Sequence, residues 1–148
     1  MTLKAVHLVR RFFEMGRPVT SEDADGTYAT EWLTADEARL WRLMDSRDRR
    51  HSVEVTRRFL AAFPSATRDE VAGALLHDVG KSAVHLGRFG RSVATIWPVT
   101  RAMIIYRDHE RLGGRMLAEI GASQRTIELV AGEVSDRAAE ALRNADDA

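Results

Sequence analysis

The segment that decides both the fold and the chemistry of this chain spans residues 74–81 and reads Ala74-Leu75-Leu76-His77-Asp78-Val79-Gly80-Lys81. An apolar helical segment here ends in an imidazole next to a carboxylate. Burying a carboxylate is costly unless something compensates its charge, and a divalent cation does so well. We expect Gly80 to end the helix and Lys81 to place a positive charge where an anionic substrate could arrive.

Two capping boxes predict where helices begin around this segment. Residues 67–70 read Thr-Arg-Asp-Glu and predict the start of the helix that carries the His77-Asp78 pair. Residues 34–37 read Thr-Ala-Asp-Glu and predict the start of another helix. Between them, Asp48 is placed to cap a third helix, which we expect to stop before Pro64.

A second histidine lies on that third helix. His51, Val55 and Phe59 are spaced four residues apart, which places them on one stripe of a helix. Because valine and phenylalanine face the interior, we expect His51 to face it as well. The sequence therefore predicts three interior polar groups on two consecutive helices.

The rest of the chain also has helical patterns, and strand signals are nearly absent because residues 92–97 form the only short β-leaning window. The chain is thus predicted to be all-α and to form a single domain over residues 1–148. The remaining predicted elements are an amphipathic helix over residues 1–13, a loop over 16–30, a glycine-rich loop from Gly80, a helix over 92–107 kinked at Pro98, and helices over 109–120, 125–134 and from 137 onward.

The composition excludes several classes of protein. Lys plus Arg (22) equals Asp plus Glu (22), so the formal net charge is zero, which argues against a general nucleic-acid binder. The chain has no cysteine, so a metal site must use His, Asp, Glu and water. No apolar run reaches the length of a membrane span and no secretion signal is visible, so we predict a cytoplasmic location without membrane contact.

The polar groups on these helices form a candidate ligand set. His51, His77 and Asp78 require a second carboxylate to complete it, and Ala145-Asp146-Asp147 offers one at the end of the last helical pattern. Two imidazoles and two carboxylates suit one divalent ion, either Mn, Fe, Co, Ni, Zn or Mg, with positions left open for water and substrate. Such an ion lowers the pKa of bound water and neutralises charge on a phosphoryl oxygen.

These residues carry a resemblance to a known family. His51, the His77-Asp78 doublet and Asp146 resemble the His…His-Asp…Asp signature of the HD-domain metal-dependent phosphohydrolase superfamily. The resemblance covers residues 49–148 and implies an HD-domain-like helical bundle. Residues 1–30 would form an N-terminal helix and loop extension, whose opening resembles small bacterial HD-domain proteins of unassigned substrate.

The resemblance also implies roles for individual side chains. His51, His77, Asp78 and Asp146 would bind the metal, and Asp78 would also orient the attacking water. Lys81 would be the second catalytic residue beside Asp78 and would contact the phosphate of the substrate. The implied substrate is a nucleotide or a related small phosphate mono- or diester, and the side chains expected to bind it are Arg50, Lys81, Arg88 and His109.

Alternatives to this assignment remain open at the level of sequence. Asp136 and Asp147 compete with Asp146 for the last ligand position. His109 lies in a segment that resembles the His-Glu-x-x-Gly stretch of two-metal members, but the further His expected one helix later is missing. Glu133 is the candidate substitute there, and one ion is predicted.

Two broader alternatives also remain. A non-catalytic HD module that binds a nucleotide or a protein partner in signalling is the alternative to an enzyme, because a fold does not determine a function. The helix containing Phe12-Phe13 is a candidate homodimer surface, although docking onto its own domain is favoured.

Overall fold

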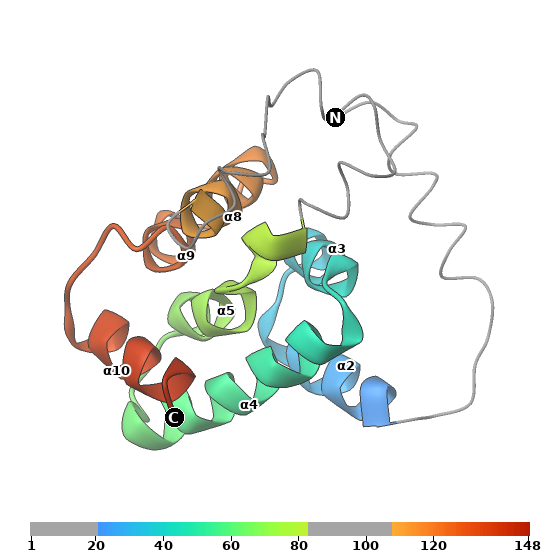
Figure 1. Cartoon of the computed structure of the whole chain (residues 1–148), viewed down its shortest axis with the longest axis horizontal. Helices are drawn as coiled ribbons and strands as arrows, with labels where there is room; N and C mark the ends of the chain where they lie inside the picture. Colours follow the sequence, from blue (N-terminus) through green and yellow to red (C-terminus); the bar gives the residue numbers. More distant parts are fainter. Residues whose placement is uncertain (1–20, 83–107) are drawn as a thin grey trace.

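The computed structural model describes residues 21–82 and 108–148, and every regular element in these residues is a helix (Figure 1). The predicted all-α class is therefore confirmed. The elements are α2 (Ser21–Trp32), α3 (Ala35–Leu43), α4 (Ser46–Ala62), α5 (Arg68–Leu76), the 3-10 helix η1 (Val79–Lys81), α8 (Asp108–Glu119), α9 (Gln124–Val130) and α10 (Arg137–Asp146).

Some sequence predictions lie outside these described residues. They are the N-terminal helix with its candidate dimer surface, the glycine-rich loop after Ser82, the β-leaning window, the helix kinked at Pro98 and the substrate-binding role of Arg88. Among the helices that are described, none is both long enough and apolar enough to cross a lipid bilayer.

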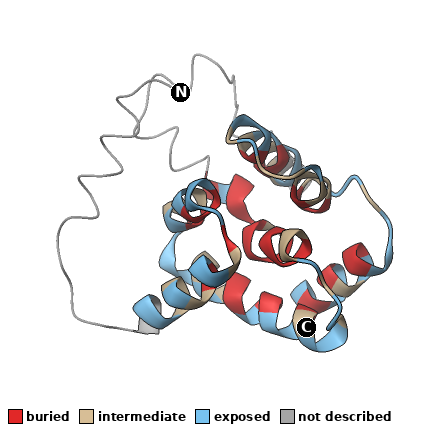
Figure 2. Cartoon of the chain, turned by 180° about the vertical axis from the view of Figure 1, so that it is seen from behind, coloured by how far each residue is buried: buried red, intermediate tan, exposed pale blue. Residues whose placement is uncertain are grey.

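Helix α5 lies at the centre of the arrangement, with α4 packed on one side and α9 on another (Figure 1). After its charged first turn, residues 71–76 are all apolar or glycine and buried, as expected of a helix segment that is surrounded by other helices. Buried residues gather on α5 and on the faces of the neighbouring helices that are turned toward it (Figure 2). The fully buried residues of α5 include Val71, Ala72, Ala74, Leu75 and Leu76.

Both predicted capping boxes are confirmed. At the start of α3, the Thr34 hydroxyl accepts the Glu37 amide at 3.3 Å and the Glu37 carboxylate accepts the Thr34 amide at 2.8 Å. Thr67 and Glu70 repeat this reciprocal pair at the start of α5 with the same two distances. Each box satisfies amide donors that the first helical turn leaves without a partner.

The two capping glutamates also join helices to one another. Glu37 is buried, and its carboxylate accepts a bond of 2.6 Å from Arg68 at the start of α5. Glu70 is buried too, and it accepts a bond of 2.7 Å from Arg125 on α9. The start of α5 is thus tied to α3 and to α9 by charged pairs that compensate the burial of each carboxylate.

The predicted loop over residues 16–30 is wrong from Ser21 onward, because residues 21–32 form α2. Gly26 and several small polar residues disfavour a helix there, but Ala29 and Leu33 are buried against the core. Packing of this kind commonly overrides weak local propensity. Helix α4 ends before Pro64 as predicted, but its N-cap is Asp45, whose carboxylate accepts the Asp48 amide at 2.9 Å.

Two predicted helix ends also differ from those observed. The helix predicted to run through Asp78 ends at Leu76, and His77 is its C-cap. Gly80 does not terminate that helix but lies within η1. Helix α9 ends at Val130 rather than continuing to residue 134, because Gly132 adopts a positive φ of 67° that reverses the chain direction.

Replacing Gly26 with alanine is expected to raise the free energy of unfolding by about 0.5–1 kcal/mol. Gly26 lies inside α2, and a Cβ added there would meet no atom within 4 Å. Urea unfolding with an unchanged m-value would measure the gain. Gly121→Ala is the matched control, since its added Cβ is equally free but its φ of 73° should make the substitution destabilising.

Candidate metal centre

The end of α5 brings the His77-Asp78 doublet to the same place as His51 of α4. One ligand atom from each of these three side chains lies within 4.8 Å of the other two. The His77 side chain is 11% exposed and that of Asp78 is 6% exposed, whereas that of His51 is 38% exposed. His51 therefore lies at the edge of the cluster rather than in the interior, while Val55 of its predicted stripe is fully buried.

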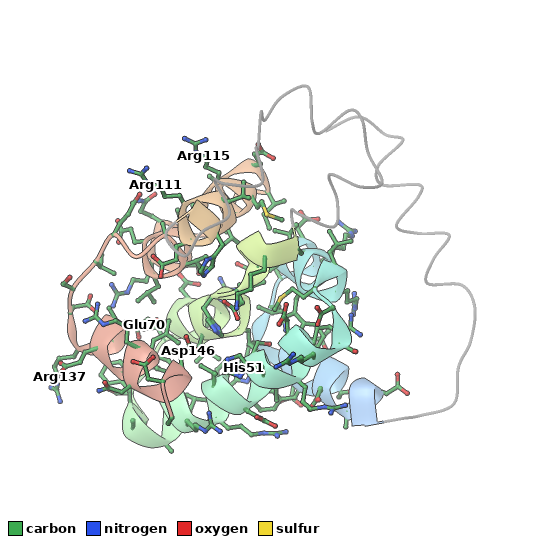
Figure 3. All side chains as sticks on the ribbon, in the orientation of Figure 1. His51, Glu70, Arg111, Arg115, Arg137 and Asp146 are labelled. Carbon is green, nitrogen blue, oxygen red and sulfur yellow. The ribbon has the colours of Figure 1, made fainter. Side chains whose placement is uncertain are left out.

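Asp146 joins this cluster from the last residue of α10. Its Oδ1 atom lies 2.8 Å from His51 Nε2 and 3.3 Å from His77 Nε2. Helix α10 packs along α4, and Figure 3 shows Asp146 at the end of α10 beside His51. The geometry thus brings together all four residues of the predicted ligand set, which come from α4, the end of α5 and α10.

The same geometry separates Asp146 from its two competitors. Asp136 is the N-cap of α10, where its carboxylate accepts the Ala139 amide at 3.0 Å. Ten residues of helix at 1.5 Å each place it about 15 Å from Asp146. Asp147 is the C-cap of the same helix and is exposed, whereas the contacts with both histidines come from Asp146. The structure therefore favours Asp146.

The orientation of the His77 ring is fixed by a backbone carbonyl. His77 Nδ1 lies 2.8 Å from the Ala74 carbonyl oxygen, which can only accept, so we assign the ring proton to Nδ1. His77 Nε2 is then the lone-pair nitrogen. It is buried and has no hydrogen-bond partner among the described residues. A histidine anchored through one nitrogen, with the other buried and facing carboxylates, has the arrangement of a metal ligand.

The pKa shifts of His77 and Asp146 also show that the cluster favours a positive charge. Burial acts to lower the pKa of His77, but Asp146 and Asp78 outweigh it and the pKa is raised. Contact with His77 holds the pKa of Asp146 well below its usual range against the effect of burial, and His51 adds to this lowering. Two carboxylates that face two imidazoles at these distances are stabilised either by a proton or by a cation between them.

Lys81 supplies a charge on the outer side of the cluster. Its ammonium lies 2.7 Å from Asp78 Oδ2, and its side chain is 46% exposed. Burial acts to lower the pKa of Lys81, but the bond to Asp78 outweighs it, so the pKa is raised and the ammonium stays charged. The lysine is therefore a charged group at the solvent edge of the cluster.

Gly80 allows η1 to pack directly against the backbone of α8. A Cβ added at Gly80 would lie 1.8 Å from the His109 carbonyl oxygen and 2.9 Å from the Gly113 amide nitrogen. This contact places His109 Nε2 3.7 Å from Asp78 Oδ1. The glycine after the His-Asp doublet is therefore required for close approach between two segments, rather than for ending a helix.

Two other predicted site residues, Arg50 and Glu133, are both exposed. Arg50 precedes His51 on α4 and is exposed. Glu133 is exposed beyond the end of α9 and is not part of the group of potential ligands found in the described residues.

The sequence interpretation assigned Asp48 only as a helix cap and missed its proximity to the cluster. It lies three residues before His51 on α4, a spacing that puts the two side chains on one side of a helix. Its pKa is raised by burial and by the charges of Asp45 and Asp78, and Lys81 partly offsets this effect. The spacing of three residues from His51 was the signal that could have identified Asp48 as a further carboxylate of this region.

Comparison with protein-family models, with curated proteins and with solved structures finds no match to this chain. The resemblance to HD-domain proteins therefore depends on the motif residues themselves. Their assembly into one cluster is independent of any relative.

Proposed function

We propose that this chain is a metal-dependent phosphohydrolase, in which His51, His77, Asp78 and Asp146 hold one divalent ion. The observation that carries the proposal is the convergence of side chains on the buried Nε2 atom of His77, which lies 3.3 Å from a carboxylate oxygen of Asp146 and 3.5 Å from one of Asp78. A proton on His77 can bridge to these carboxylates, and a divalent cation shared by the imidazole and the carboxylates would neutralise more of their charge.

The residues present fit such an ion. Two imidazoles and two carboxylates suit Mn, Fe, Co, Ni, Zn or Mg, and the Ala74 carbonyl supplies the outer contact that orients His77. When bound, the ion would lower the pKa of a water ligand and neutralise charge on a phosphoryl oxygen.

The surrounding side chains support a phosphate ester as substrate. In this mechanism Asp78 would orient the attacking water; its Oδ2 lies 2.7 Å from the Lys81 ammonium and its Oδ1 lies 3.7 Å from His109 Nε2. The half-exposed ammonium of Lys81 would bind a phosphoryl oxygen, and the exposed Arg50 would add a second positive charge. These groups suit a nucleotide or a related small phosphate mono- or diester.

The direct test combines metal analysis with an activity panel. The purified chain is stripped with a chelator, reloaded with Mn²⁺ and assayed against nucleoside monophosphates and cyclic nucleotides. We expect stoichiometric metal and hydrolysis that depends on it. Binding of both metal and nucleotide without turnover would instead support a non-catalytic module, and a chain that binds no metal would overturn the proposal.

Replacing Lys81 with methionine is expected to retain metal binding while raising KM by roughly tenfold or more, because a hydrogen bond to a charged group contributes about 1.5–3 kcal/mol. Steady-state kinetics and calorimetric Mn²⁺ titration separate the two effects. Lys81→Arg is the control, since it keeps the charge and should recover part of the lost affinity. An unchanged KM in the methionine variant would exclude a phosphate-binding role for Lys81.

A further inference from the structure

One guanidinium joins the starts of three helices, at the opposite end of α5 from the candidate metal centre. Arg125, in the first turn of α9, donates from Nε and Nη2 to Glu70 Oε1 at 3.1 and 2.7 Å. Its Nη1 donates to Asp136 Oδ2 at 2.6 Å. Glu70 belongs to the first turn of α5 and Asp136 is the N-cap of α10. Both α5 and α10 lead from this point toward the metal centre.

Contacts besides those of Arg125 also hold α9 against α5. The Thr126 hydroxyl donates to the Asp69 carbonyl oxygen at 2.9 Å, and Thr126 is fully buried. Gly73 and Leu129 also pack closely, since a Cβ on Gly73 would lie 3.2 Å from the leucine side chain. The contact that Arg125 contributes beyond these is the one to α10.

The buried face of α10 offers few large side chains that would fix its position along its own axis. That face consists of Ala138, Ala139, Leu142 and Ala145. Alanine presents a single methyl group, so ridges and grooves between helices are shallow there. Polar contacts at the two ends of α10 must therefore set its axial position to a large extent.

The metal centre is sensitive to that position. A shift of α10 by one residue moves its end by 1.5 Å. The contact of 2.8 Å between Asp146 and His51 would not survive such a shift. Figure 3 shows Arg137 at the start of α10 and Asp146 at its other end beside His51, so an axial shift of the helix at its start would also displace Asp146.

We propose that Arg125 is a positioning residue for the metal centre. By binding Glu70 and Asp136 together, it fixes α10 relative to α5, and this places Asp146 against His51 and His77. The relevance of Arg125 to metal binding rests on the proposed function, whereas its control over the contact between Asp146 and His51 does not.

The test is an Arg125→Met variant of the full chain, measured in two ways. Calorimetric titration is expected to give an Mn²⁺ affinity about tenfold weaker, the lower end of the range typical of residues that orient metal ligands. In the metal-free protein, the Nε2 resonance of His51 is expected to move toward its position in an Asp146→Ala variant, which marks complete loss of the contact.

Two further variants separate positioning from general stability. Arg68→Met removes a similar pair between helices at the start of α5, but its partner Glu37 lies on α3, so it should lower stability without changing either readout. Asp136→Asn keeps an N-cap residue while removing the charge, and should weaken Mn²⁺ binding in the same direction. The double variant Arg125→Met with Asp136→Asn should bind Mn²⁺ little more weakly than Arg125→Met alone, because both changes remove the same contact between Arg125 and Asp136.

The outcomes distinguish this proposal from the proposed function. Wild-type Mn²⁺ affinity and an unmoved His51 resonance in Arg125→Met would overturn the positioning role, as would an equal loss of affinity in Arg68→Met. If the unmodified chain binds no Mn²⁺, the proposed function fails, but the His51 resonance still decides the role of Arg125. If Arg125→Met does not fold, Asp136→Asn provides the same decision.

Discussion

A His77→Ala variant is expected to lose stoichiometric binding of Mn²⁺, with an affinity weakened by more than about 100-fold, because losing a direct ligand costs more than losing a residue that orients one. The His77 side chain is only 11% exposed, and its Nδ1 atom is committed to the Ala74 carbonyl. Alanine removes Nε2, the ring nitrogen left to bind a metal, together with the Nδ1 contact that orients the ring. Calorimetric titration measures the loss directly.

A second readout makes this result independent of calorimetry. A ligand that binds only the folded state stabilises it by about 2.7 kcal/mol when its concentration is 100 times Kd. Added Mn²⁺ should therefore raise the melting temperature of the unmodified chain but not that of His77→Ala.

His109→Ala is the matched control, since it removes an imidazole that faces the other oxygen of Asp78 at 3.7 Å and lies outside the four-ligand set. It should retain Mn²⁺ binding. Equal loss in both variants, or wild-type affinity in His77→Ala, would contradict the assignment of His77 as a ligand.

The features of the fold that sequence predicted well are those determined by neighbouring residues. A capping box depends only on residues three apart, so Thr34 and Thr67 mark true helix starts. The pairing of His51 with Val55 through a spacing of four placed it on the correct side of α4, although the position of His51 near the start of that helix leaves it partly exposed.

The features that sequence could not predict depend on distant packing. Helix α2 forms because Ala29 is buried against the core, which its own residues do not reveal. The choice of Asp146 over Asp136 depends on the direction in which α10 lies along α4. The convergence of Glu70 and Asp136 on Arg125 joins three helix starts, of which that of α5 is 55 residues from Arg125, and no periodic pattern marks it.

Gly80 has a role that its sequence motif suggested and another that only distant packing reveals. It also gives the prediction with the largest expected effect on stability. Its place in the His-Asp-Val-Gly-Lys motif suggested a helix terminator, which requires only local conformational freedom. The positive-φ glycines among the described residues are Gly121 and Gly132, so Gly80 does not serve that purpose. Its lack of a side chain is instead required by α8, whose backbone occupies the space of a Cβ.

Gly80→Ala is therefore expected to lower the free energy of unfolding by about 3 kcal/mol, the upper part of the usual range for overpacking. The added Cβ would lie 1.8 Å from the His109 carbonyl oxygen, and backbone atoms cannot rotate away as a flexible side chain can. Either α8 moves outward, which withdraws His109 from Asp78, or η1 moves and displaces Asp78 itself. Urea unfolding measures the loss, and Gly26→Ala, where the same methyl group meets open space, should change stability in the opposite direction. Stability of Gly80→Ala close to that of the unmodified chain would mean that η1 and α8 are not in direct backbone contact.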